Sequence, residues 1–216
     1  MYTLKKDFLG QGHRLRPGGS NTKNAITIHS TSNPTSSADN ERKWLDNPQN
    51  TRIASWHYVV GENEVIQAIP DRETAYHCGN ATGNAYSLGI EIIESGERSA
   101  VLLTAAEFVA DKLKELNLTP EALRQHFNWS GKDCPRILRN KNYIQGVMDW
   151  DWFKKVVSMY YNGEIVEYAP MKVDGQYLLV RRILKDGTNY IAIRDIANNL
   201  GFDISNEGNI AVLNKK

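Results

Sequence analysis

The run Ser87–Ile93 (SLGIEII) constrains the fold more than any other part of this sequence. It is short, almost entirely apolar and rich in β-branched residues, which indicates a buried strand within a sheet. Its single charged residue is Glu91, between Ile90 and Ile92. Because an unpaired carboxylate is costly to bury in an apolar interior, we expect Glu91 to face a cleft.

Further strands are expected earlier in the chain. The run Ala25–His29 (AITIH) alternates apolar and polar residues and predicts a strand that ends at a histidine. Residues 53–60 and 64–69 flank a Gly-Glu-Asn turn at 61–63 and predict a hairpin. Together with Ser87–Ile93, these segments predict a mixed sheet.

Helical segments are expected around this sheet. The pattern predicts a short helix capped by Asp39 or Asn40, a second from Thr104 to about Leu116, and a third over Gln145–Tyr161. In the third helix, Trp150 and Val157 are expected to face inward. We therefore predict an α/β fold over residues 1–162, with a mixed central β-sheet flanked by helices.

After Asn162-Gly163 the sequence changes in character. Strand-like runs, a turn and a short helix follow one another in a stretch near the lower size limit for independent folding. The expected elements are strands at 176–184, 190–193 and 210–213 and a helix at 194–200 that ends before Gly201. We expect residues 163–216 to form a separate, small α+β C-terminal domain.

Composition excludes several classes of protein. The 216 residues carry a net charge of only +1, which argues against nucleic acid as a partner. No run approaches the roughly 18 apolar residues of a membrane span. The N-terminal MYTLKKDFLG lacks the apolar core of a secretory signal, so we expect synthesis in the cytoplasm. A substrate outside the membrane would then require a separate route of release.

Three side chains in the first domain suit a zinc ion: His29, His126 and Cys134, the last two in the segment HFNWSGKDCPR. Zinc binds imidazole nitrogen and thiolate sulfur in a tetrahedron, and a catalytic zinc keeps three protein ligands and one open position. The spacing of His126 and Cys134 matches no standard zinc-finger pattern. By spacing alone, a buried histidine, a surface histidine and a core cysteine are an equally good explanation.

Five short blocks follow one another along most of the first domain: IHST at 28–31, SWHYVV at 55–60, AYHCG at 75–79, LGIEI at 88–92 and HFNWSGKDCPR at 126–136. In this combination the chain resembles the type 2 N-acetylmuramoyl-L-alanine amidases, the family of many phage endolysins and of animal peptidoglycan-recognition proteins. The resemblance implies bacterial peptidoglycan as the partner. It also implies zinc-dependent hydrolysis of the bond between N-acetylmuramic acid and L-alanine.

The same resemblance implies a role for five residues. His29, His126 and Cys134 would hold Zn²⁺, in agreement with zinc's preference for nitrogen and sulfur donors. Glu91 would be the general base that takes a proton from water. Lys132 would stabilise the oxyanion of the tetrahedral intermediate. The plainer explanations are an exposed glutamate at a strand end and a solvated loop lysine.

Two further residues are expected to bind substrate. His77 matches a histidine that lies in the substrate groove of relatives. Trp56 stands where some relatives carry a tyrosine that assists the reaction, and its indole would pack against substrate or fill the core. His57 must point to the opposite face of a strand from Trp56, so we expect it to be structural. Cys78 is expected to be a small buried hydrophobe.

The C-terminal run TNYIAIRDIANNLGFDISNEGNIAVLN resembles the small N-terminal, or stalk, domain named after copper amine oxidases. The matching positions are Tyr190, Arg194, Ile196, Ala197, Leu200 and Gly201. The run contains no histidine, so no copper site is implied. Fused to an amidase, such a module suggests attachment to the cell wall. A folding appendage or a dimerisation unit is the alternative, and the oligomeric state is left open.

Other functions fit parts of the pattern. The same fold without catalysis would be a peptidoglycan-binding module, although relatives of that kind tend to lose the cysteine ligand and Cys134 is present. A zinc peptidase for another wall amide also fits, because the sequence does not reveal the shape of the groove loops that set selectivity. The layout without an export signal favours a phage or prophage endolysin, and an autolysin exported by another route would look the same.

Overall fold

The computed structural model describes residues 2–139, 148–163, 167–173, 175–185, 188–207 and 210–216. The chain divides into two compact units, Met1–Gly163 and Glu164–Lys216. This division lies one residue from the boundary that the sequence predicts. None of the described helices is long and apolar enough to cross a membrane.

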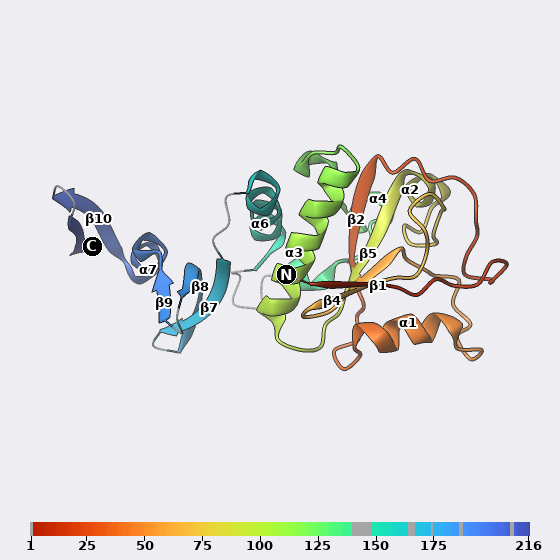
Figure 1. Ribbon diagram of the computed structural model, residues 1–216, viewed down its shortest axis with the longest axis horizontal. Coiled ribbons are helices and arrows are strands. Elements are labelled where there is room, and N and C mark those ends of the chain that lie inside the picture. The colour runs from red at the N-terminus through yellow and green to blue at the C-terminus, as the bar shows by residue number, and fades with distance from the viewer. Residues whose placement is uncertain (1, 140–147, 164–166, 174, 186–187, 208–209) are drawn as a thin grey trace. The chain divides into compact units, whose positions relative to one another are not determined.

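A mixed sheet forms the centre of the first unit (Figure 1). Within the described residues its strands are β1 (Thr3–Lys6), β2 (Ala25–Ser30), β3 (Tyr58–Val60), β4 (Glu64–Gln67), β5 (Ser87–Ile92) and β6 (Leu123–Gln125), in the order β1-β4-β3-β5-β2-β6. β5 runs parallel to both of its neighbours, β2 and β3, and β6 runs parallel to β2. β3 and β4 form the expected antiparallel hairpin. The predicted fold class is confirmed.

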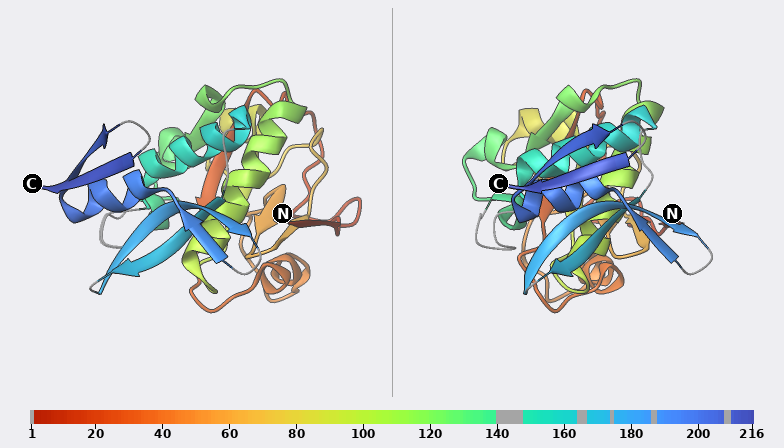
Figure 2. Two further views of the ribbon diagram at one scale, coloured as in Figure 1. Left: turned by 60° about the vertical axis from the view of Figure 1, so that its left-hand side comes forward. Right: turned by 90° about the vertical axis from the view of Figure 1, so that its left-hand side faces the viewer.

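Helices flank this sheet, as Figures 1 and 2 show. They are α1 (Ala38–Asp46), α2 (Ala81–Tyr86), α3 (Arg98–Glu115), the 3-10 turn η1 (Pro120–Ala122), α4 (Phe127–Ser130), α5 (Arg136–Arg139) and α6 (Trp150–Asn162). α3 packs on β3 and β5, and α6 lies along α3 (Figure 2). α1 packs on β3 and β4, while α2 packs on β5. All of β2 is buried, so the sheet carries the core of this unit.

Two helices begin earlier than the sequence predicts. α3 starts at Arg98 rather than Thr104, because the Glu97 carboxylate accepts hydrogen bonds from the backbone N–H groups of Ser99 (3.2 Å) and Ala100 (2.7 Å). Thr104 lies inside the helix, and its hydroxyl donates to the backbone carbonyl of Glu62. α1 is capped by Ser37 rather than by Asp39 or Asn40.

Two other elements are shorter than expected. β3 contains only Tyr58–Val60, because Ser55 pairs with Tyr76 in a neighbouring loop instead of extending the strand. α6 begins at Trp150, which is only partly buried, whereas Val157 faces the core as predicted. The start expected at Gln145 lies outside the described residues.

The second unit is a small α+β fold, as the sequence predicts. β7 (Glu167–Val173), β8 (Gln176–Lys185) and β9 (Thr188–Ile191) form an antiparallel sheet, and β10 (Phe202–Glu207) pairs with β11 (Ile210–Lys215). α7 (Ile193–Leu200) joins the two hairpins and ends at Gly201, whose φ of 74° suits a glycine cap. The Asp195 carboxylate of α7 accepts hydrogen bonds from the Arg181 guanidinium of β8. β7 and β10 were not expected from the sequence.

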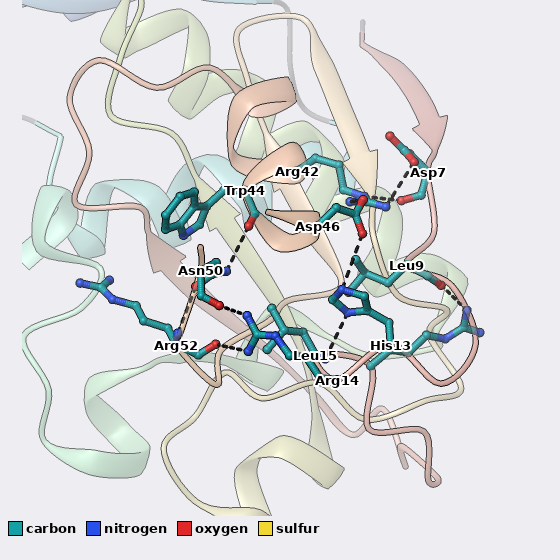
Figure 3. Close-up of polar contacts among 11 residues, drawn as sticks. Asp7, Leu9, His13, Arg14, Leu15, Arg42, Trp44, Asp46, Asn50 and Arg52 are labelled. Carbon is teal, nitrogen blue, oxygen red and sulfur yellow. Dashed lines mark hydrogen bonds and ion pairs between the residues drawn. The ribbon is translucent and has the colours of Figure 1, made fainter. Parts of the chain in front are cut away.

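Polar contacts tie the segment before β2 to α1 and to the loop that follows it (Figure 3). Arg42 donates to the backbone carbonyl of Asp7 (2.5 Å) and to Asp46 (2.6 Å). Arg14 donates to the backbone carbonyls of Asn50 and Arg52 (Figure 3). These contacts hold the irregular N-terminal segment against α1 and its loop, and the fully buried side chains of Leu9 and Leu15 add apolar contacts.

His57 is a structural residue of the sheet, as expected. Its ring is fully buried between β5 and a neighbouring loop. The Gly89 N–H donates to Nδ1 (2.9 Å), and Nε2 donates to the backbone carbonyl of Glu73 (2.9 Å). Burial lowers the pKa of His57 to about 4, with the Glu73 bond opposing part of the shift.

This buried imidazole makes stability depend on pH. The folded-state pKa is lower than the unfolded value of about 6.5, so the unfolded chain binds a proton that the folded chain excludes. The contribution of neutral His57 to the unfolding free energy is therefore complete above about pH 6.5, and it is lost as the pH falls toward 4. Between pH 7 and pH 5 we expect His57 to account for a loss of about 2 kcal/mol in unfolding free energy. Burial also lowers the pKa of His29, His77 and His126, so these groups add to the loss in the parent and in any His57 variant. Urea unfolding with chelator present should therefore show a loss between pH 7 and pH 5 that is about 2 kcal/mol smaller in His57→Asn than in the parent.

Asparagine keeps an acceptor for the Gly89 N–H, which makes this variant the least disruptive one. As a check without any substitution, NMR titration of the parent should give a His57 midpoint near pH 4. A midpoint near 6.5 would contradict the prediction.

Candidate metal centre and active site

The carboxyl ends of three adjacent strands converge on one edge of the sheet. His29 of β2 is paired with Glu91 of β5, and Ile28 is paired with Gln125 of β6. His126 follows β6 directly, and its N–H donates to the backbone carbonyl of Ile28 (3.3 Å). Because paired residues on neighbouring strands share a face, His29 and Glu91 project to the same side of the sheet.

His29, His126 and Cys134 come together in this place. The two Nδ1 atoms are 3.0 Å apart, and Cys134 Sγ is 3.8 Å from His29 Nδ1. All three donor atoms lie within 4.8 Å of one another, and all three residues are buried. A tetrahedral zinc with bonds of about 2.0–2.1 Å to nitrogen and 2.3 Å to sulfur needs donor atoms roughly 3.3–3.6 Å apart. The observed separations bracket this range, so the three residues fit a zinc ion.

The loop that carries Cys134 is fixed to β2 and β5 by an ion pair. The Glu94 carboxylate, just after β5, accepts two hydrogen bonds from Arg136 Nε (2.9 and 3.0 Å). Glu94 also accepts from the Ser32 N–H (3.0 Å), and the Arg136 N–H donates to the hydroxyl of Ser30 (3.1 Å). The chain just after the cysteine is thereby held beside the end of the strand that carries His29.

Burial sets the protonation of the three candidate ligands. It lowers the pKa of His126 to about 4 and that of His29 well below its usual range, and the positive charge of Lys132 lowers both further. Both imidazoles are therefore neutral at pH 7 and keep a lone pair for a metal. Burial raises the pKa of the Cys134 thiol to about 12. A metal that binds there must displace the thiol proton.

Two ionisable side chains, Glu91 and Lys132, act on this cluster. Glu91 Oε2 is buried and has no hydrogen-bond partner among the described residues. Burial raises the pKa of Glu91 to about 8, with Glu41 adding to the shift and Lys132 opposing it. Lys132 itself is exposed, and its charge acts on Glu91 and on all three candidate ligands. The cluster thus has a carboxyl group and an ammonium group within electrostatic reach.

Comparison with known proteins assigns the chain to a family. The family model of the N-acetylmuramoyl-L-alanine amidases matches residues 19–137, more than half of the chain. The chain belongs to this family. The resemblance found in the sequence is confirmed for the first unit, and the resemblance of the C-terminal unit to a stalk domain stays a prediction.

Relatives of this amidase occur in Bacillus. The amidase CwlH of Bacillus subtilis (strain 168) is 35% identical over 196 residues, which cover 85% of this chain and 78% of CwlH. That match is longer than the first unit and so extends into the second. The amidase XlyA of the same strain is 34% identical over 160 residues, which cover 71% of this chain and half of XlyA.

Solved structures agree with the fold of the first unit. The catalytic domain of XlyA superposes with a TM-score of 0.64 at 32% identity and covers 72% of this chain and 99% of that domain. The PlyG catalytic domain superposes with a TM-score of 0.62 at 26% identity and covers 78% and 99% of the two chains. The first unit therefore has the same fold as these catalytic domains.

The two predicted substrate residues of the amidase are mostly buried. His77 is 6% exposed, and its Nδ1 lies 3.0 Å from His29 Nε2. Trp56 is 7% exposed, and its indole Nε1 has no hydrogen-bond partner within the described part of the chain. Their contact with substrate stays a prediction. Cys78 is a fully buried free thiol, as expected for a small hydrophobe, and Cys134 is also free.

The sequence did not predict the residues that hold the candidate ligands and His77 in place. Glu94 and Arg136 support the cysteine loop, and Asn84 of α2 accepts hydrogen bonds from the N–H groups of His77 (2.9 Å) and Cys78 (2.7 Å). Arg136 directly follows the Cys-Pro pair, and Glu94 lies just beyond the buried strand. The position of each charge next to a motif is the signal that the sequence offers. Nothing in the sequence pairs them, because the contact depends on the fold.

The Glu94–Arg136 pair should contribute measurably to stability. The Glu94 side chain is fully buried, whereas the Arg136 side chain is 36% exposed, which weakens the pair through solvent screening. We expect Glu94→Gln to lower the unfolding free energy by about 1–3 kcal/mol in urea titrations with chelator present. The matched control is Asp133→Asn, which removes the pair with Arg139 where the Asp133 side chain is 72% exposed. That change should cost less than about 0.5 kcal/mol. Equal losses in the two variants would contradict the prediction.

Proposed function

We propose that this amidase is a zinc-dependent hydrolase that cuts the bond between N-acetylmuramic acid and L-alanine in bacterial peptidoglycan. The observation that carries the proposal is the convergence of His29, His126 and Cys134 beside Glu91, whose Oε2 has no hydrogen-bond partner among the described residues. Membership of the amidase family supports it, as does the name of the relative CwlH.

In this proposal His29, His126 and Cys134 hold Zn²⁺ through two Nδ1 atoms and one thiolate. Their donor set is the one zinc prefers, and their number leaves a position open. When bound, the ion supplies Lewis acidity, which polarises a carbonyl and makes water a nucleophile near neutral pH. A divalent cation beside Glu91 also favours the carboxylate form of that side chain.

Glu91 and Lys132 perform the proton transfer and the charge stabilisation. Glu91 takes a proton from the attacking water and delivers it to the leaving nitrogen of L-alanine. Its position on a buried strand holds the carboxylate in one place, and its Oε2, which accepts no hydrogen bond within the described part of the chain, is available for the proton. The Lys132 ammonium stabilises the oxyanion that develops on the lactyl carbonyl oxygen. Neither cysteine is needed as a nucleophile, because in this proposal Cys134 is committed to the metal.

We further propose that the enzyme acts as a phage or prophage endolysin, with the C-terminal unit serving for attachment to the wall or for dimerisation. The resemblance of that unit to a stalk domain supports a binding role. The alternatives are an autolysin, a non-catalytic peptidoglycan-binding module and a peptidase for another wall amide.

The decisive test is the appearance of new N-terminal L-alanine in purified cell walls, scored by amine labelling and mass spectrometry. We expect new alanine amines from the protein as purified, none after treatment with chelator, and recovery with zinc. Walls that bind the protein without releasing any amine would identify a binding module. New amines on another residue would identify a different wall amide as the substrate.

Substitution of the two charged residues should separate catalysis from metal binding. We expect Glu91→Gln to lower kcat by about 10²–10⁴-fold, because a general base of that efficiency is lost. Lys132→Met should lower it by about 10²–10³-fold through loss of oxyanion stabilisation. Both variants should keep one equivalent of zinc by metal analysis. The control is Lys43→Met, which removes an exposed lysine on α1 and should leave kcat unchanged. Full activity of Glu91→Gln would overturn its assignment as the base.

A further inference from the structure

The outer nitrogens of both histidine ligands face a single short segment of the chain. The Nδ1 atoms of His29 and His126 face each other, so Nε2 of each ring points away from the candidate metal position. Nε2 of His29 lies 3.0 Å from Nδ1 of His77. His126 donates to the backbone carbonyl of Cys78, and a Cβ placed on Gly79 would lie 3.7 Å from its Nε2. Two consecutive residues therefore contact the two candidate ligands, His77 at His29 and Cys78 at His126.

The tautomers follow from these contacts. A metal-binding Nδ1 needs its lone pair, so Nε2 of His29 carries the hydrogen and donates it to His77 Nδ1. His77 must then carry its own hydrogen on Nε2, which lies 3.2 Å from the backbone carbonyl of Ser87 and donates to it. No positive charge is required in this series of hydrogen bonds. The Cys78 Sγ also lies 3.2 Å from His77 Nδ1, so this nitrogen has two neighbours. Burial lowers the pKa of His77 well below its usual range, which agrees with a neutral ring.

The position of His77 is fixed on several sides. Its ring lies over Gly89, on the face of β5 that also carries Glu91, and a Cβ at Gly89 would come within 2.6 Å of His77 Cγ. The backbone of His77 and Cys78 is held by the Asn84 carbonyl oxygen, which accepts both N–H groups. Only 6% of His77 is exposed, which leaves little surface for substrate.

From this geometry we infer that His77 is a positioning residue for the metal, which acts by accepting a hydrogen bond from His29, and that Asn84 holds the His77–Cys78 segment from which both histidine ligands are oriented. The inference rests on the zinc site of the proposed function and assigns His77 a task other than substrate contact. Outer partners of metal-bound histidines are usually carboxylates, carbonyls or water. Here a neutral histidine takes that place.

Two substitutions of His77 divide its two hydrogen bonds. His77→Asn places an amide oxygen near the position of Nδ1, so it keeps the acceptor for His29 and loses the bond to Ser87. His77→Gln places an amide nitrogen near the position of Nε2, so it keeps the bond to Ser87 and loses the acceptor. Both are neutral amides of similar size, which makes each the control for the other.

The readout is the zinc dissociation constant of the full chain, measured by competition with a chromogenic chelator. We expect His77→Asn to bind zinc within about threefold of the parent and His77→Gln to bind it about 10–100-fold more weakly. The Co²⁺-loaded proteins provide a second readout. The visible d–d bands of His77→Gln should shift because the ring of His29 turns, whereas those of His77→Asn should match the parent.

Several results would overturn the inference. Equal zinc affinity of the two variants, or weaker binding by His77→Asn, would mean that the bond to His29 carries no function. A higher KM for cell walls with unchanged zinc affinity would make His77 a substrate residue. A loss of zinc affinity that follows a lower urea midpoint of the metal-free variants would make its role merely structural. A parent protein that binds no zinc at all would overturn the proposed function itself, before any variant is compared.

Asn84 gives an independent test if His77→Gln does not fold. Asn84 lies on a partly exposed helix, so its substitution disturbs the core less. Asn84→Asp keeps an oxygen for the two N–H groups and should retain zinc affinity. Asn84→Ala removes it and should weaken zinc binding by about tenfold or more. Equal zinc affinity in these two variants would remove Asn84 from the inference.

Discussion

Parallel pairing of β2 with β5 and β6 is the interaction on which the rest of the site depends. It places the carboxyl ends of three strands at one edge of the sheet, with His29 beside Glu91 and His126 one residue beyond β6. Ile26 and Ile28 lie on one face of β2, and Thr27 and His29 lie on the other, so a shift of one residue in register would exchange the two sets. The hydrophobic core therefore fixes the geometry of the polar site.

Burial has a second consequence for the chemistry. The candidate ligands are kept as neutral imidazoles and a protonated thiol, and burial also favours the neutral form of Glu91. The positive charge near them belongs to Lys132. A metal ion would bring positive charge into a site where burial disfavours protonated, positively charged imidazoles. The apolar strands around Glu91 raise its pKa when no cation is present. The same low-dielectric surroundings strengthen the effect of a nearby cation, which would lower that pKa again.

Each class of ligand has its own support. The cysteine loop is held by the Glu94–Arg136 ion pair. The outer nitrogen of His29 contacts His77, and His126 donates a hydrogen bond to the backbone carbonyl of Cys78. Both supports start from residues adjacent to or packed on β5: Glu94 follows this strand, and His77 lies over its Gly89. The central strand thereby connects Glu91, the cysteine loop and the two histidines.

The sequence by itself determined the α/β class, the buried strand around Glu91, the hairpin of β3 and β4, and the resemblance that assigns the family. These follow from local patterns of apolar residues and from short motifs, which need no knowledge of distant contacts. The predicted bounds of helices and strands were wrong where a distant contact or a competing local group sets them. Examples are the Glu97 cap, which starts α3 earlier, and the pairing of Ser55 with Tyr76, which shortens β3. Only the tertiary structure decided that His77 lies behind His29 and that Glu94 meets Arg136. Those contacts join residues far apart in the chain, and their distances are set by how strands and loops pack, a property that no single segment of the sequence contains.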